Sequence, residues 1–425
     1  MAAPLEGARR GIPRADLLAA AAVFGGALAL LGAMVFLGGV VTDFWAHAHW
    51  ALEVRAGTAF PANFLYYLVV AVLAGRHPDL RGALLASVVV AAAAVAAKFW
   101  LARGAWREAL VATDWRQVKP RPAGDGRSRG RPAEPRPGGG ALPDWAPRLA
   151  LWGAAGLVMA HNLVVPGVAA VHPYLGNFPP NVWHNPTTIA VAPLAFAHFW
   201  QSYRYLYAGA RPRLHVLVLL GLANVFVKPS YALVFVVVFP LFALTRPMPA
   251  RERAAAATVV AACLAAIALV YVFVYQRPPP DSQLPLYAPS HVAVEPLRVW
   301  RHLAPNLPLS FLVSTAFPLG FACAYARQAA ASPLFRYAGA HFLVALAMYA
   351  LLAEAGPREF DGNFAWQLVL CNFILFFACA VMLSQAVIAR GRAAARDRIL
   401  IGLAAAHVAS WFAYVHHMLA HHTFA

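Results

Sequence analysis

Long runs of apolar residues, about 15 to 25 residues each, alternate along the chain with short polar segments. Runs of this length match the thickness of a bilayer core at helical rise. The pattern predicts an all-α fold, a polytopic transmembrane helical bundle of about 11–12 membrane segments. The predicted segments are Leu17–Val41, Phe60–Gly75, Gly82–Leu101, Leu149–Ala169, Ile189–Tyr207, Val216–Val227, Tyr231–Leu244, Ala254–Tyr275, Ser310–Tyr325, Tyr337–Ala353, Trp366–Ile388 and Ile399–Leu419.

The apolar pattern is interrupted once over a long stretch, Arg103–Arg148, which is rich in Pro, Gly and Arg and has no apolar periodicity. We interpret it as a disordered basic cytoplasmic insertion. The chain then divides into residues 1–102, with the first membrane segments and outer loop, the insertion 103–148, and residues 149–425, with the remaining helices and loops.

Composition agrees with this pattern, since 61% of residues are hydrophobic, 12% are charged and the mean hydropathy is +0.60. The net charge of +17 comes mostly from loops, so it indicates orientation in a membrane and not nucleic-acid binding. The four cysteines fall inside apolar runs, where we expect free packing residues. A multi-pass protein of the inner (plasma) membrane is predicted.

Basic turns alternate with acidic or aromatic loops from the C-terminus back to Leu149, and this places His184, Lys228 and Asp361 on the outer side. The arginines before the first helix favour an N-terminus on the inner side, which disagrees with that count by one crossing. Either the short run Phe60–Gly75 is re-entrant or one predicted boundary is wrong.

Acidic residues are rare, at 17 of 425, and several of them lie at predicted membrane surfaces. An amphipathic juxtamembrane helix is predicted in the first outer loop, with Asp43 and His47 on one face and His49 and Glu53 on another. One pocket would accommodate only one of these pairs. A carboxylate held beside histidines at a membrane surface is typical of chemistry more than of packing.

Three further outward stretches are expected to meet this loop. Lys228 is one of three lysines and precedes Pro229, where a second half-helix begins; the ammonium and the positive end of that helix suit a phosphate group. The candidate binding residues of the three stretches are Tyr174, Asn177, Asn181, Trp183, His184, Asn185, Thr187, Lys228, Ser230, Glu359, Asp361, Asn363 and Trp366.

Structural explanations compete with each of these assignments. Asp43 could cap the helix that follows Thr42, and Asn185 with Pro186 could simply start a helix. The acidic loop could be an ordinary solvated loop. The histidines near the C-terminus have a spacing that could bind a metal, but no acid accompanies them, so no metal site is predicted.

Together these motifs resemble bacterial membrane glycosyltransferases of the GT-C type. The resemblance rests on Asp43 with His47 after the first helix, on Trp183-His184-Asn185-Pro186-Thr187, on Lys228-Pro229-Ser230 and on Gly362-Asn363-Phe364-Ala365-Trp366. It covers roughly Asp43 to Trp366 without the insertion. Many relatives carry a paired acid in the first outer loop, whereas Thr42 precedes Asp43 here, so the base is either Asp43 or Glu53.

The resemblance implies inverting transfer of a sugar from a polyprenyl-phosphate-linked donor to a glycan, lipid or protein hydroxyl at the outer membrane face, without a cofactor. Asp43 would be the general base, with His47 beside it, and Lys228, helped by His184, would stabilise the leaving phosphate. The expected partners are the donor, the acceptor and membrane lipids, and no nucleic acid. A transporter or flippase of a lipid-linked or small polar solute is the alternative.

Overall fold

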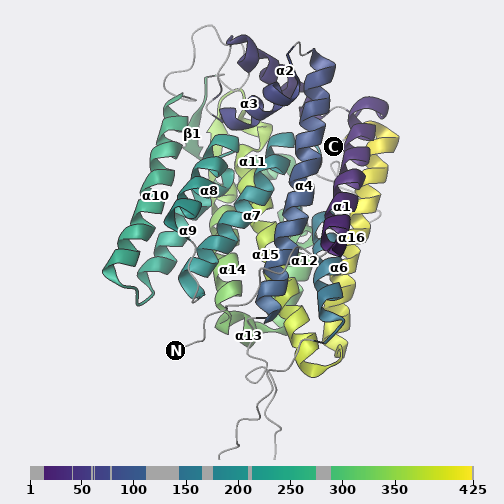
Figure 1. Cartoon of the computed structure of the whole chain (residues 1–425), viewed down its shortest axis with the longest axis vertical. Helices are drawn as coiled ribbons and strands as arrows, with labels where there is room; N and C mark the ends of the chain where they lie inside the picture. Colours follow the sequence, from purple (N-terminus) through teal and green to yellow (C-terminus); the bar gives the residue numbers. More distant parts are fainter. Residues whose placement is uncertain are drawn as a thin grey trace, which may run out of the picture.

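The computed structural model describes residues 14–40, 42–58, 61, 63–76, 79–111, 143–164, 176–208, 213–273 and 289–423. These residues form a bundle of α-helices with one small two-stranded sheet at the upper end in Figure 1. The predicted polytopic helical bundle is therefore confirmed.

Seven of the described helices are long and apolar enough to cross a membrane. They are α1 with its π-helical continuation (Arg14–Leu37), α4 (Leu80–Val111), α10 (Ala250–Tyr271), α12 (Leu307–Ala324), α14 (Pro333–Leu351), α15 (Trp366–Arg390), which follows two 3-10 turns, and α16 (Ala395–His421). Four apolar helices are shorter, namely α3 (Phe64–Leu73), α6 (Ala146–Met159), α8 (Leu214–Val227) and α9 (Ser230–Leu244). The other helices are α2 (Asp43–Ala56), α7 (Pro186–Tyr207), α11 (Arg298–Leu303) and α13 (Ala326–Ala331).

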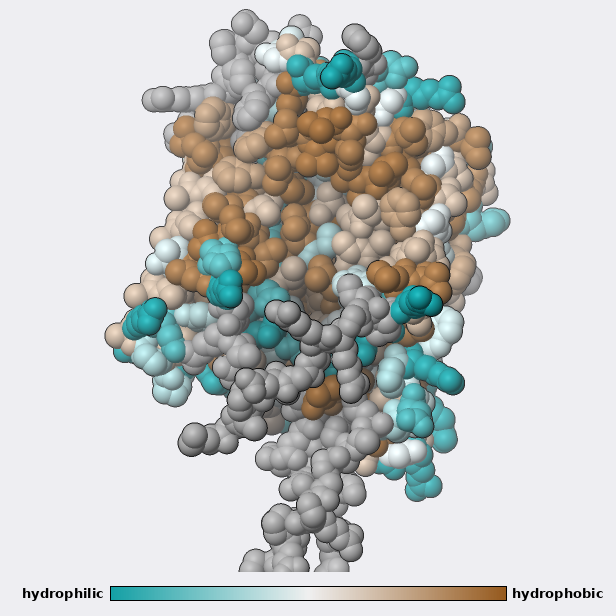
Figure 2. Space-filling model, viewed as in Figure 1, coloured by the Kyte–Doolittle hydropathy of each residue, from teal (hydrophilic) through white to brown (hydrophobic). Residues whose placement is uncertain are grey.

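The bundle is built around α15, whose most apolar window is 89% buried, against 22–56% for the other six long helices. Helices α4, α6, α7, α9, α12 and α14 all pack against it. Apolar side chains form a band across the middle of the face shown in Figure 2, with hydrophilic residues above and below. This distribution is the one a bilayer requires, because the hydrocarbon layer contacts the band.

Ion pairs at the lower end fix how α1 runs relative to α4. Asp16, in the first turn of α1, pairs with Arg103 and, at 2.9 Å, with Arg107 near the end of α4. The start of α1 and the end of α4 therefore lie at the same end of the bundle, with α2 and α3 together at the other (Figure 1). The ten residues of α3 rise only about 15 Å, so α3 does not add a crossing. Of the two explanations for the mismatched crossing, the structure supports a re-entrant α3.

The same ion pairs correct one predicted boundary. Helix α4 continues to Val111, so the insertion does not begin at Arg103. The sequence prediction ended the helix at the first arginine after the apolar run. The helix continues because Arg103 and Arg107 face the Asp16 carboxylate of α1. Helix α6 begins at Ala146, also inside the predicted insertion, while residues 112–142 lie outside the described residues.

The predicted loop Gln276–Pro308 is also partly structured. Its described part contains β1 (His291–Val294), α11 and the start of α12. Strand β1 pairs antiparallel with β2 (Leu352–Ala355), with His291 opposite Ala355, and β2 takes up the end of the predicted span Tyr337–Ala353. These strands form because two segments distant in the sequence pair with each other, and no local sequence pattern predicted them.

Helices α8 and α9 form a hairpin around Lys228-Pro229, as the break in the sequence predicts. Along α9, Tyr231 makes an edge-to-face contact with His198 of α7 and Phe239 lies against Tyr205, so α9 runs beside α7 towards the lower end. Phe226, just before the turn, contacts Phe64 at the start of α3. The hairpin turn therefore lies beneath α3.

We expect Asp16→Asn to lower the free energy of unfolding by about 3 kcal/mol, because it leaves the buried Arg103 guanidinium without its carboxylate partner. Unfolding in mixed detergent micelles measures the change. Asp144→Asn, at an exposed position of the same end, is the control and should change stability by less than about 0.5 kcal/mol. Equal stability of Asp16→Asn and wild type would contradict the role of the ion pair.

Candidate functional site

Helix α2 carries the first candidate residues at the upper end. Thr42 is its N-cap with extended backbone angles, Asp43 opens the helix, and Gly57 ends it at a left-handed φ of 73°. A carboxylate in the first turn is favoured by the helix dipole. The buried face of α2 has helical spacing and faces α3, α4 and α7. Its members are Phe44, His47, Ala48 and Ala51.

His47 is held on this buried face as a neutral imidazole. Its Nδ1 lies 2.7 Å from the Tyr67 hydroxyl of α3. Burial lowers the pKa of His47 to about 3, Asp43 opposes this shift and Lys228 adds to it. The imidazole thus supplies a hydrogen bond to α3 and no positive charge at neutral pH.

Asn185 connects the Asp43 carboxylate to the start of α7. As the N-cap, its Oδ1 accepts the Thr188 N–H at 2.9 Å, with Pro186 as the first helical residue. The structural explanation offered by the sequence, a helix start, is therefore correct. The same amide also donates through Nδ2 to Asp43 Oδ2 at 2.7 Å. Asp43 does not act as the N-cap of α2, because that position belongs to Thr42.

The Lys228 ammonium approaches the opposite side of the same amide. Its Nζ donates to Asn185 Oδ1 at 3.3 Å and to Thr187 Oγ1 at 3.2 Å, and it lies 4.5 Å from the centre of the Trp366 ring. The Asn185 amide therefore lies between the Asp43 carboxylate and the Lys228 ammonium, whose hydrogen-bond partners among the described residues are neutral. Such an ammonium retains the capacity to attract an anion.

Burial lowers the pKa of Lys228, in the turn between α8 and α9, to about 7; the attraction of Asp43 opposes this and Arg358 adds to it. A bound anion would favour the charged form of this amine. The protonation of Lys228 is therefore coupled to the binding of an anion.

His184 lies beside this centre. Its Nδ1 is 3.3 Å from the Tyr414 hydroxyl of α16, and its ring is 6.0 Å from that of Trp366. Burial, and next the charge of Lys228, lowers the pKa of His184 to about 3. A neutral imidazole can donate a hydrogen bond to a ligand but adds no positive charge.

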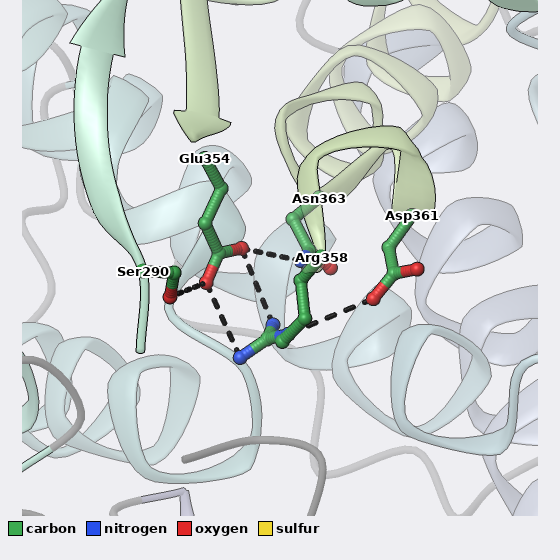
Figure 3. Close-up of polar contacts among 5 residues, drawn as sticks. All are labelled: Ser290, Glu354, Arg358, Asp361 and Asn363. Carbon is green, nitrogen blue, oxygen red and sulfur yellow. Dashed lines mark hydrogen bonds and ion pairs between the residues drawn. The ribbon is translucent and has the colours of Figure 1, made fainter. Parts of the chain in front are cut away.

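The acidic loop after β2 forms a network around Glu354 (Figure 3). The Arg358 guanidinium lies 3.2 Å from each carboxylate oxygen of Glu354. Glu354 Oε1 also accepts from the Ser290 hydroxyl at 3.1 Å, and Oε2 accepts from Asn363 Nδ2 at 2.5 Å. Arg358 reaches Asp361 as well, at 3.6 Å. This loop is thus tied together by ion pairs and is not simply a solvated segment.

Asp361 and Arg358 of this network interact electrostatically with Asp43 and Lys228, the charged residues on either side of Asn185. Burial raises the pKa of Asp361, and the Asp43 charge contributes to that shift. The Arg358 charge acts on Lys228. Glu359, in contrast, pairs with Arg298 of α11 and forms part of the loop's own packing.

The remaining candidates divide between this centre and other places. Asn181 binds Lys98 of α4, and Trp183 is buried against Trp411. Ser230 opens α9 next to the Lys228 turn. Asn177 is partly buried, His49 is exposed and Glu53 is partly exposed on α2, while Tyr174 lies outside the described residues.

Four residues of the surroundings were not among the predicted site residues: Tyr67, Lys98, Arg358 and Tyr414. A lysine inside an apolar run is a signal that could have identified Lys98. The tyrosines and Arg358 carry no such signal, because their importance arises only from contacts with distant segments.

No family model, no curated protein and no solved structure matches this chain. Among the described residues, no group of three or more His, Cys, Asp or Glu side chains is placed to hold a metal ion. The described cysteines are all free. Function must therefore be argued from the geometry around Asn185.

The buried imidazole of His47 makes the stability of the folded protein depend on pH. The unfolded chain takes up this proton near pH 6.5, whereas the folded protein does so only near pH 3, so the contribution is complete above pH 6.5 and is lost as pH falls towards 3. We expect His47→Gln to recover about 2 kcal/mol of the stability that wild type loses between pH 7 and pH 4.5.

Equilibrium unfolding at a series of pH values measures this effect. His49→Gln is the matched control on the same helix, because His49 is exposed, and it should keep the wild-type acid dependence. If His47→Gln also keeps that dependence, His47 does not carry a buried neutral imidazole.

Proposed function

We propose that this multi-pass membrane protein is an inverting glycosyltransferase of the plasma membrane. It would move a sugar from a polyprenyl-phosphate-linked donor to an acceptor hydroxyl at the face that carries α2. The observation that supports the proposal is the Asn185 amide, which donates to the Asp43 carboxylate at 2.7 Å and accepts from the Lys228 ammonium at 3.3 Å. A proton acceptor and an anion-attracting group thereby share one small region.

This arrangement suits a direct displacement at the anomeric carbon. The acceptor oxygen attacks the sugar C1 while its proton passes to the Asp43 carboxylate. The bond from C1 to the phosphate oxygen breaks, and the lipid phosphate leaves with the electron pair. Lys228 stabilises the charge on that phosphate, and the neutral His184 supplies a hydrogen bond. A single displacement inverts the anomeric configuration and needs one carboxylate base.

Local geometry favours Asp43 over Glu53 as this base. Asp43 is bonded to Asn185, and its charge acts on Lys228 and Asp361. Glu53 lies at the other end of α2, where its backbone carbonyl accepts a hydrogen bond from the Thr58 hydroxyl at 3.2 Å. The donor class also suits a bundle with a hydrophobic band on its surface (Figure 2), because a polyprenyl chain would reach the protein from the bilayer.

A transporter is the second candidate, and one observation favours it. A buried polar chain crosses α7, α9 and α14, in which the Tyr231 hydroxyl contacts His341 at 3.3 Å and Tyr337 contacts Ser202 at 2.9 Å. Buried histidines and tyrosines inside a membrane bundle are also typical of solute and proton pathways. The two candidates differ in whether a covalent product forms.

We expect Asp43→Asn to lower transfer from radiolabelled polyprenyl-phosphate sugars by about a thousandfold, because the amide cannot accept the acceptor proton. Glu53→Gln is the matched control and should keep transfer within about threefold of wild type. A loss in Glu53→Gln with Asp43→Asn active would assign the base to Glu53. Solute uptake by wild-type proteoliposomes without any transfer product would favour the transporter.

Lys228→Met is expected to lower kcat/KM for transfer by about a hundredfold, because it removes the cation that steadies the leaving phosphate. Lys228→Arg keeps the charge and should retain more activity than Lys228→Met. The measurement is initial rates over a range of donor concentrations. Equal rates for Lys228→Met and wild type would remove Lys228 from the proposed mechanism.

A further inference from the structure

A second buried ammonium lies deeper in the bundle than Lys228. Lys98 is on α4 and is 7% exposed as a residue. Its Nζ donates to Asn181 Oδ1 and lies 4.6 Å from the centre of the Phe373 ring. Among the described residues, no carboxylate is within ion-pair distance of Lys98. A buried charge of this kind is costly unless another charge compensates it.

Lys98 borders a small cavity between α4, α7 and α15. Asn181, Thr188 and Phe373 also line it, together with apolar side chains of α7 and α15. It has room for roughly one water-sized particle. Thr188 is only 2% exposed, and its buried hydroxyl has no hydrogen-bond partner within the described part of the chain.

The groups around the cavity select a ligand that accepts hydrogen bonds. The Asn181 amide is already engaged, because its Oδ1 accepts from Lys98 and its Nδ2 donates to the backbone oxygens of Leu157 and Ala160, both at 2.7 Å. The groups that remain are N–H bonds of the Lys98 ammonium and the Thr188 hydroxyl. A neutral water would satisfy these donors but would leave the ammonium charge uncompensated, whereas a monatomic anion does both.

We propose that this cavity binds a halide-sized monovalent anion, of which chloride is the abundant one, between the Lys98 ammonium and the Thr188 hydroxyl. Larger oxyanions do not fit the space. The site stands apart from the proposed transfer chemistry and does not depend on it. It is nevertheless adjacent to Asn185, because the Thr188 backbone N–H donates to Asn185 Oδ1 at 2.9 Å. Anion binding would therefore stabilise the start of α7.

Thermal unfolding of the purified full-length protein in sodium chloride and in sodium gluconate at equal ionic strength tests the proposal. We expect chloride to raise the unfolding midpoint by about 3 °C or more. Bromide should produce the same shift, and a crystal soaked in bromide should show an anomalous scattering peak beside Lys98.

Lys98→Met should abolish the chloride shift while the protein still folds, because an apolar side chain replaces a buried charge. Lys228→Met, at the other described lysine, is the control and should retain the shift. The proposal is overturned if wild type shows no halide dependence, if Lys98→Met keeps the full shift, or if bromide gives no peak at Lys98. None of these measurements requires sugar transfer, so the two proposals can fail separately.

Discussion

An apolar helical bundle can hold a charged side chain only where another group compensates it, and this constraint organises the described structure. Asp16 of α1 compensates Arg103 and Arg107 of α4, and it does so from a single carboxylate. The pairing makes α1 and α4 antiparallel neighbours. The chain between them must therefore turn at the upper end, where α2 and α3 lie (Figure 1). The position of Asp43 follows from that turn.

The same constraint explains why Asn185 lies at the centre of the candidate site and contacts both of its charged groups. An amide offers both donors and an acceptor, so one side chain can cap α7, bind the Asp43 carboxylate and accept from the Lys228 ammonium. An aspartate at this position would repel Asp43, and an apolar residue would remove the hydrogen-bond partner that both charged groups share. Helix start and site geometry are consequently one structural feature, and a change at Asn185 would alter both.

Burial also decides which candidate residues carry charge. Burial lowers the pKa of both His47 and His184; Asp43 opposes the shift at His47, whereas the charge of Lys228 adds to it at His184. Of these three candidate residues, Lys228 is therefore the cation beside Asn185. The two lysines of the described chain approach the connection before α7 from different sides, Lys98 at Asn181 and Lys228 at Asn185. The connection contains no Asp or Glu, so the two ammonium groups hold it through hydrogen bonds to asparagine side chains and not through ion pairs.

The sequence by itself determined the helical bundle, the break at Lys228-Pro229 and the starts of α2 and α7, because apolar run length, proline and capping residues act within a few neighbouring positions. It also gathered Asp43, Asn185 and Lys228 as candidates, since polar residues are conspicuous between apolar runs. Only the tertiary structure decided that α3 does not cross, that α4 extends past Arg103, that β2 pairs with β1, and that Tyr67, Tyr414 and Lys98 support the candidate residues. Each of these features depends on a partner from a distant part of the chain, and no local pattern specifies which partner burial will bring into contact.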